Sequence, residues 1–145
     1  MERRLFLAAT LASLGARSAG GADLVPVVAS FSVLADMTRQ IGGPYVNVDS
    51  LVGPDGDVHV YEPTPRDLRR VKAARMLVRN GLQLEGWMDR LTEAAGFAGT
   101  VVVAANKVMP RTMHEAGGAI TVDPHAWQDP RNAVLYVQAI GSGLA

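Results

Sequence analysis

The sequence contains no cysteine, and this absence excludes several kinds of site at once. Disulfide frameworks, cysteine-based zinc knuckles and thiol nucleophiles all require that side chain. Any transition metal bound by the chain must therefore be held by histidine, aspartate, glutamate or water. Histidine is also scarce, with three residues in 145, so the search for a metal site is confined to a few positions.

An excess of charge of either sign is also lacking. The 14 basic and 14 acidic residues balance to a formal net charge of zero. A nucleic-acid-binding surface needs a basic excess, so we expect no nucleic-acid partner. What is present is globular material, with 48% hydrophobic and 19% charged residues in a chain of 145 residues. That length and composition are typical of one domain with a single core.

Apolar runs long enough to span a membrane are missing as well. The apolar run at residues 5–14 is too short to cross a bilayer. It follows Arg3 and Arg4 and precedes the small residues at 18–22, which is the pattern of an export signal. We therefore predict that residues 1–22 are a cleaved signal peptide. A buried N-terminal helix is the structural alternative.

The export route is left open by the sequence. Residues 3–7, Arg-Arg-Leu-Phe-Leu, resemble the twin-arginine export pattern, but many Sec signals also begin with two basic residues. Either route predicts a periplasmic protein whose mature domain is residues 23–145.

Short apolar runs that suit buried strands alternate with segments of helical periodicity. Strands are expected at residues 24–30, 45–52, 76–78 and 101–105, with a short extended piece at 121–122. Helices are expected at residues 32–41, 65–74, 84–95 and from 130 to about 140. This alternation predicts an α/β fold, a single lobe with a central, mostly parallel sheet flanked by helices. In such open sheets, ligands bind beyond the C-terminal ends of the strands.

Three of the predicted helices have recognisable start signals. Thr64 is a predicted N-cap, with Asp67 three residues later as in a capping box. Asp129 precedes a proline at the first position of the last helix, and Ser32 is a plausible N-cap for the first helix.

Two of the histidines lie in loops where a sheet of this kind presents ligand-binding groups. His59 follows the strand at 45–52, and His125 directly precedes the last helix. Two neutral imidazoles suit zinc, manganese or iron. Asp57 and Asp123 are candidates to orient the rings by hydrogen bonds, or simply to cap turns. On spacing alone, two loop histidines so far apart are more often surface residues than a metal pair.

Other polar and aromatic residues near these positions have two interpretations each. Tyr61 is a candidate to shape a cleft beside His59. Trp127 is a candidate to pack under the loop and hold His125, although core packing explains it equally well. His114, in the predicted loop at 110–118, is either a solvated residue or an auxiliary metal contact.

Three stretches of the chain resemble the motifs of a known family. Residues 53–65 (GPDGDVHVYEPTP) resemble the first metal-ligand motif of the zinc- and manganese-binding solute-binding proteins of bacterial ABC importers. Residues 80–89 (NGLQLEGWMD) look like the segment that follows it in that family. Residues 123–133 (DPHAWQDPRNA) are similar to the second ligand motif. The resemblance covers nearly all of residues 24–140, with the three motifs in the right order.

The resemblance implies a two-lobed α/β protein that holds its metal in the cleft between the lobes, which are joined by a long rigid helix. It implies that His59 and His125 are the ligands of the first lobe, and that the second lobe adds a histidine or glutamate and an aspartate. This chain ends before the joining helix is complete. We therefore interpret residues 23–145 as the N-terminal lobe with the second lobe absent. Because the chain alone would offer the ion only two protein ligands and water, we predict that it binds metal weakly and with little selectivity.

The function implied by the resemblance is transport without catalysis. The chain would capture zinc or manganese outside the cytoplasmic membrane, as a monomer, and deliver it to an ABC permease in that membrane. One alternative is an exported zinc metallohydrolase, in which a metal-bound water attacks the substrate. A non-functional fragment and a surface adhesion protein are the other interpretations, and no residue pattern supports adhesion separately.

Overall fold

The structure, a computed structural model, describes residues 23–115 and 117–145. The predicted export signal at residues 1–22 lies outside this part of the chain. Within the part described, none of the helices combines the length and the apolar character needed to cross a membrane.

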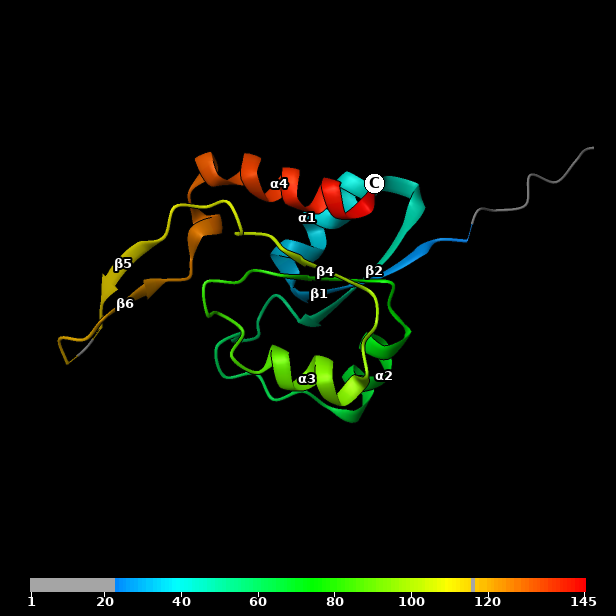
Figure 1. The fold of residues 1–145 in the computed structure, drawn as a ribbon, viewed down its shortest axis with the longest axis horizontal. Coiled ribbons are helices and arrows are strands. Elements are labelled where there is room, and N and C mark those ends of the chain that lie inside the picture. The colour runs from blue at the N-terminus through cyan, green and yellow to red at the C-terminus, as the bar shows by residue number, and fades with distance from the viewer. Residues whose placement is uncertain (1–22, 116) are drawn as a thin grey trace, which may run out of the picture.

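A four-stranded parallel sheet forms the centre of the molecule (Figure 1). Its strand order is β2 (Val46–Val52), β1 (Val25–Phe31), β3 (Met76–Arg79) and β4 (Thr100–Val103). The central strand β1 pairs with a neighbour on each side, since Val27 lies opposite Val48 of β2 and Met76 of β3. The predicted α/β class with a mostly parallel sheet is confirmed.

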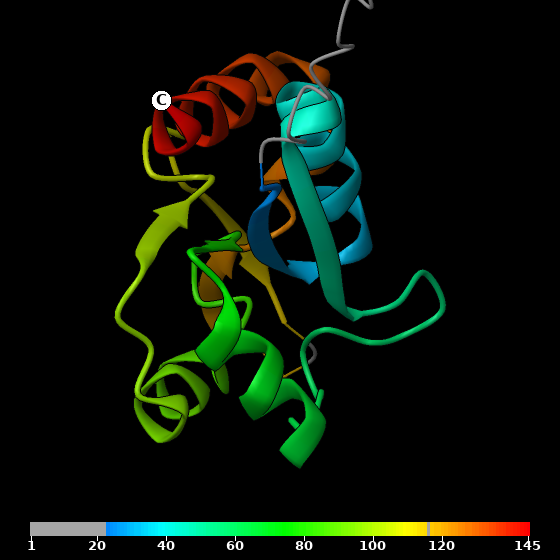
Figure 2. The same ribbon diagram turned by 90° about the vertical axis from the view of Figure 1, so that its right-hand side faces the viewer.

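Two helices cover each face of this sheet (Figure 2). Helices α1 (Ser32–Gly42) and α4 (Pro130–Leu144) pack together on one face, and α2 (Pro65–Ala73) and α3 (Met88–Ala95) pack together on the other. Two short 3-10 turns, η1 (Gly43–Tyr45) and η2 (Ala126–Gln128), precede β2 and α4. Since helices exclude water from both faces, the inner strands are continuous apolar runs rather than alternating ones.

The core lies where the two inner strands meet the helices. Residues of β1, β3 and all four helices are almost completely buried there, among them Val27, Ala29, Leu77, Val78, Leu34, Ala35, Val71, Met88, Tyr136 and Ile140. Burial at this density makes the strand ends a rigid platform, because a close-packed interior has little room to shift. The loop that carries His59 leaves this sheet at the end of β2.

The predicted helix starts are confirmed at two of three positions. The Thr64 side chain accepts a hydrogen bond from the backbone N–H of Asp67, whose carboxylate accepts one from the backbone of Thr64. The Asp129 side chain caps α4 in a similar way. The third start was wrong by one residue, because Phe31 occupies the N-cap position of α1 and Ser32 is its first helical residue.

The predicted helix at residues 84–95 was too long at its N-terminal end. Helix α3 begins at Met88, and the residues before it form turns. The turns begin with Gly81, Leu82 and Gln83, which have left-handed φ angles of 86°, 52° and 64°. The apolar spacing was read correctly as burial, but it reflects packing of a turn rather than of a helix.

The predicted loop at residues 110–118 is instead part of a hairpin that projects from the body of the molecule (Figure 1). Strand β5 (Arg111–His114) pairs antiparallel with β6 (Ile120–Asp123). The hairpin escaped prediction because β5 is exposed and its residues lack apolar alternation. The extended piece expected at 121–122 is confirmed as part of β6, and α4 runs four residues past 140 to Leu144.

Candidate metal centre

His59 and His125 meet at one edge of the molecule. His59 lies in the loop between β2 and α2, and His125 lies between β6 and η2. Their Nε2 atoms are 3.2 Å apart, and the two rings are tilted by 55° with their centroids 5.2 Å apart. The His59 residue is exposed, whereas the His125 side chain retains 31% of its exposure.

The 3.2 Å separation allows two chemical arrangements. One ring donates an N–H hydrogen bond to the other, or both present lone pairs to a shared cation. Two nitrogens bound to a tetrahedral zinc ion at 2.0–2.1 Å stand roughly 3.3–3.4 Å from each other. An ion between His59 and His125 therefore requires little movement of either ring.

Asp123 contacts the imidazole of His125 at Nδ1, the ring nitrogen that does not face His59. Its Oδ1 lies 2.8 Å from Nδ1 of His125 and also accepts a hydrogen bond of 3.0 Å from the backbone N–H of that residue. These two contacts, the backbone one first, lower the pKa of the Asp123 carboxyl below its usual value. An anionic partner at Nδ1 favours the tautomer with the proton there, which leaves the Nε2 lone pair facing His59.

Asp57 has a different role from Asp123. Its Oδ1 accepts a hydrogen bond of 2.9 Å from the backbone N–H of His59 and thereby closes a turn. Of the two interpretations of Asp57, the structure shows the turn cap.

Tyr61 contacts Asp67 and Trp87. Its hydroxyl donates to Oδ2 of Asp67 at 2.9 Å, and its ring packs at a tilt on Trp87, with centroids 5.1 Å apart. Burial, and then the hydrogen bond with Asp67, raise the pKa of the Tyr61 hydroxyl. Tyr61 thus joins the loop of His59 to the start of α2.

Trp127 lies between the candidate site and the core. Its ring is 5.4 Å from the ring of His125 and 4.9 Å from that of Phe31, measured between centroids. Phe31 ends β1, so this contact fixes the loop of His125 against the central strand of the sheet.

The third histidine borders the same space as the other two. His114 lies on β5 and is exposed, and it lines an open cavity of about 570 Å³ together with His59 and His125. In residues 23–115 and 117–145, no group of three or more histidine, aspartate and glutamate side chains is arranged to hold a metal ion. The site is therefore a pair of imidazoles beside an open cavity.

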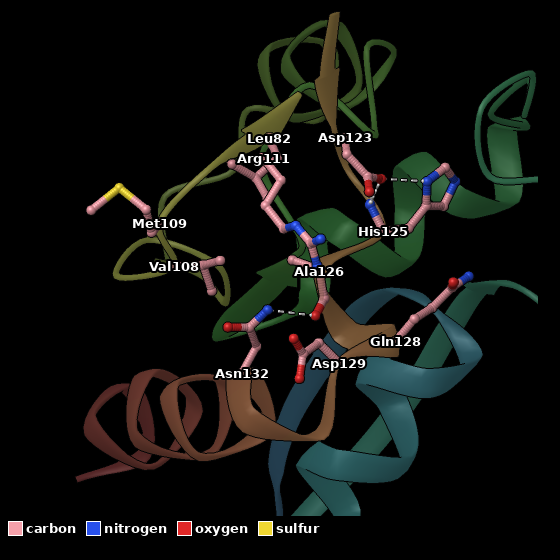
Figure 3. Close-up of a pocket in the computed structure, with 10 residues that line it drawn as sticks. All are labelled: Leu82, Val108, Met109, Arg111, Asp123, His125, Ala126, Gln128, Asp129 and Asn132. Atoms are coloured by element: carbon pink, nitrogen blue, oxygen red, sulfur yellow. Dashed lines mark hydrogen bonds and ion pairs between the residues drawn. The ribbon is translucent and has the colours of Figure 1, made fainter. Parts of the chain in front are cut away.

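A smaller cavity of about 190 Å³ adjoins His125 on the side of α4 (Figure 3). The side chain of Arg111 from β5 lines this cavity (Figure 3). Asn132 and Ala126 also line it, and the Nδ2 of Asn132 donates a hydrogen bond of 2.9 Å to the carbonyl of Ala126. Asp123 and His125 also line this cavity, so the oriented imidazole borders both spaces.

Two supporting residues escaped sequence reasoning. Asn80 is fully buried and donates from Nδ2 to the carbonyl of Pro124 at 2.9 Å, and Trp87 donates from Nε1 to the carbonyl of Val58 at 2.8 Å. The sequence feature that could have indicated a role for Asn80 is the position of this polar residue directly after an apolar strand.

Comparisons with known proteins identify the family of the chain. The sequence pattern of the family described as "Zinc-uptake complex component A periplasmic" matches residues 27–145. The iron-binding protein YfeA of Yersinia pestis is 32% identical over 118 residues, which are 81% of this chain and 38% of YfeA. The manganese-binding lipoprotein MntA of Bacillus subtilis is 34% identical over 129 residues, or 88% of this chain and 42% of MntA.

A solved structure shows the same fold. The manganese-bound periplasmic metal binding protein of Candidatus Liberibacter asiaticus superimposes with a TM-score of 0.71 at 30% identity, over 81% of this chain and 44% of that one. The chain thus spans less than half the length of the relatives it matches. The resemblance seen in the three motifs is confirmed, and the chain belongs to the family of zinc-uptake complex component A periplasmic proteins.

Proposed function

We propose that this chain is the metal-binding lobe of a solute-binding protein that captures zinc or manganese for an ABC importer. The observation that carries the proposal is the 3.2 Å approach of the Nε2 atoms of His59 and His125. In this proposal both atoms bind the metal, and Asp123 holds the second imidazole in the metal-binding tautomer.

The chemistry of the pair suits several divalent ions. Imidazole binds zinc, iron and other first-row metals, and it does not by itself select among them. The relatives agree with that breadth, since one is named as iron-binding and another as manganese-binding. We therefore add iron to the zinc and manganese expected from the motifs.

Two imidazoles occupy only part of a metal's coordination sphere. In the proposed complex the remaining positions are filled by water or by groups outside the described residues. Each ligand that is not already in place must be ordered when the ion binds, and this lowers the affinity. The chain alone is expected to bind metal weakly, and weak binding also permits release to a transporter.

Export and delivery complete the proposal. Residues 1–22 would act as the export signal, by the Sec or the twin-arginine route, and the lobe would work in the periplasm as a monomer. In support of export, the matched family is described as periplasmic, and the relative MntA is named as a lipoprotein. The partner that receives the metal would be the permease of the importer.

Metal retention by histidine variants tests the proposal. The purified chain, His59→Ala, His125→Ala and the control His114→Ala are dialysed against zinc, manganese or iron(II), and bound metal is measured by mass spectrometry. We expect loss in the first two variants and retention in His114→Ala. Equal retention in all four proteins contradicts the assignment of the pair.

A further inference from the structure

The peptide group that precedes each candidate ligand forms a hydrogen bond with an aspartate two residues earlier in the chain. The N–H of His59 donates to Oδ1 of Asp57 at 2.9 Å, and the N–H of His125 donates to Oδ1 of Asp123 at 3.0 Å. Each aspartate lies two residues before its histidine. The nitrogen side of each peptide group is therefore fixed locally.

The carbonyl side of each of these peptide groups is held from farther away. The Val58 carbonyl accepts a hydrogen bond of 2.8 Å from Nε1 of Trp87, and the Pro124 carbonyl accepts one of 2.9 Å from Nδ2 of Asn80. Trp87 is 5% exposed and Asn80 is 0% exposed, so water does not compete for these bonds. A peptide group held at both its oxygen and its nitrogen cannot rotate without breaking one of the bonds.

Both distant donors come from one short segment, residues 80–87, between β3 and α3. The segment begins with the left-handed turn at Gly81, Leu82 and Gln83. A left-handed φ is unfavourable for the last two residues, because both carry a Cβ atom. Such a turn persists only when the surrounding structure over-determines it.

Glu85 supplies that constraint from inside the segment. Its Oε1 accepts hydrogen bonds of 2.6 Å from both Oγ of Ser30 and the backbone N–H of Asn80, and its Oε2 accepts one of 3.1 Å from the backbone N–H of Gly81. Glu85 is 3% exposed. The carboxylate therefore folds the segment back on itself and ties it to the end of β1.

Tyr136 of α4 orients the amide of Asn80. Its hydroxyl donates to Oδ1 of Asn80 at 2.5 Å, and the Tyr136 residue is 0% exposed. With Oδ1 occupied in this way, Nδ2 faces the carbonyl of Pro124. The network thus runs from Ser30 of β1 through Glu85 and Asn80 to the peptide group of His125.

We propose that Asn80 and Trp87 are positioning residues for the metal pair and that Glu85 is their shared support. Asn80 acts on His125, and Trp87 acts on His59. Neither residue touches the metal. Their joint effect is to keep the two imidazoles close before an ion arrives, which lowers the entropic cost of binding. This inference rests on the proposed metal role of His59 and His125.

A crossed pair of variants tests the inference without metal. Asn80→Ala removes the donor to Pro124, and Trp87→Phe removes the donor to Val58 while keeping an aromatic ring. Imidazole ¹H–¹⁵N NMR spectra of the metal-free chain are compared with the unmodified protein. We expect Asn80→Ala to shift or broaden the His125 signals and spare His59, and Trp87→Phe to do the reverse. Identical histidine spectra in all three proteins overturn the proposal.

Metal affinity provides the second measurement. Zinc is titrated in competition with a chromophoric chelator, and each variant is expected to bind roughly tenfold or more weakly, as for other groups that hold metal ligands in place. Thr38→Val is the matched control, since Thr38 is also 0% exposed and bonds only within α1. It should lower the urea midpoint and leave zinc affinity unchanged.

A milder variant covers the case in which Asn80→Ala does not fold. Tyr136→Phe removes only the hydroxyl that orients Asn80, and it should perturb His125 in the same direction with a smaller loss of affinity. Zinc affinity within twofold of the unmodified chain in both Trp87→Phe and Tyr136→Phe refutes the positioning role. Failure of the proposed function differs from this, because then His59→Ala and His125→Ala would also leave zinc binding unchanged.

Discussion

The Nε2 atoms of His59 and His125 lie 3.2 Å apart although 66 residues separate them in the sequence. The first histidine reaches this position from the end of β2 and the second from the end of β6. Two imidazoles that approach this closely either share a proton or share a cation. The hydrogen bond between Asp123 and Nδ1 of His125 favours the arrangement in which Nε2 of His125 is free to bind an ion.

Asp123→Asn is expected to weaken zinc binding about tenfold, because the amide no longer fixes the tautomer of His125. Asp57→Asn is the matched variant, since Asp57 contacts only the backbone of His59. Calorimetric titration of both proteins compares them. An equal or larger loss in Asp57→Asn would contradict the orienting role of Asp123.

Tyr61→Phe is expected to leave zinc affinity unchanged and to lower the free energy of unfolding by about 1 kcal/mol. The reason is that the Tyr61 hydroxyl donates to Asp67 and not to a histidine. Urea unfolding and zinc titration of the same protein separate the two effects. A tenfold loss of zinc affinity at unchanged stability would assign Tyr61 to the metal site instead.

Acid is expected to destabilise the fold in part through Asp67. Burial raises the pKa of this carboxyl, but hydrogen bonds from Thr64, Tyr61 and Arg70 outweigh burial and bring it below the usual 3.8. A carboxyl whose pKa is lower in the folded state stabilises the fold above its unfolded pKa, and that contribution is lost as the pH falls through the folded value. Stability measured by urea unfolding should therefore decline below about pH 4, and the decline should be shallower in Asp67→Asn. If the free energy of unfolding falls equally steeply with pH in both proteins, Asp67 does not contribute to the acid sensitivity.

Zinc is expected to raise the melting temperature of the chain, since an ion that binds only the folded state stabilises it by mass action. The increase should grow with zinc concentration, shrink as the pH is lowered because protons compete for imidazole, and vanish in His125→Ala. Differential scanning calorimetry with and without a chelator measures it. An equal increase in His125→Ala would place the stabilising ion elsewhere.

Much of the fold was readable from the sequence because the inner strands of a sheet covered on both faces are plain apolar runs. The four strands of the sheet and the cap at Thr64 followed from local pattern alone. The hairpin of β5 and β6 did not, since its strands are stabilised by pairing with each other and not by burial. The third helix was predicted to begin four residues too early, at residue 84 instead of Met88, because the buried carboxylate of Glu85 bonds to the backbone of the preceding turn in ways that periodicity does not reveal.

The candidate site, like the fold, could be predicted from the sequence only in part. The positions of His59 and His125 in loops were visible in the sequence, and the resemblance of the motifs around them implied a shared role. The contacts of Asn80 and Trp87 with the peptide groups before them were not visible. Those contacts join residues that are far apart in the chain, so they depend on tertiary packing that no local pattern specifies.

X-ray absorption spectroscopy of the zinc-loaded chain tests the central claim most directly, because it counts the imidazoles bound to the ion. The account predicts two imidazoles about 2.0–2.1 Å from zinc, with oxygen ligands in the other positions. It also predicts that one imidazole disappears in His59→Ala or His125→Ala. A first shell made only of oxygen in the unmodified chain would contradict it.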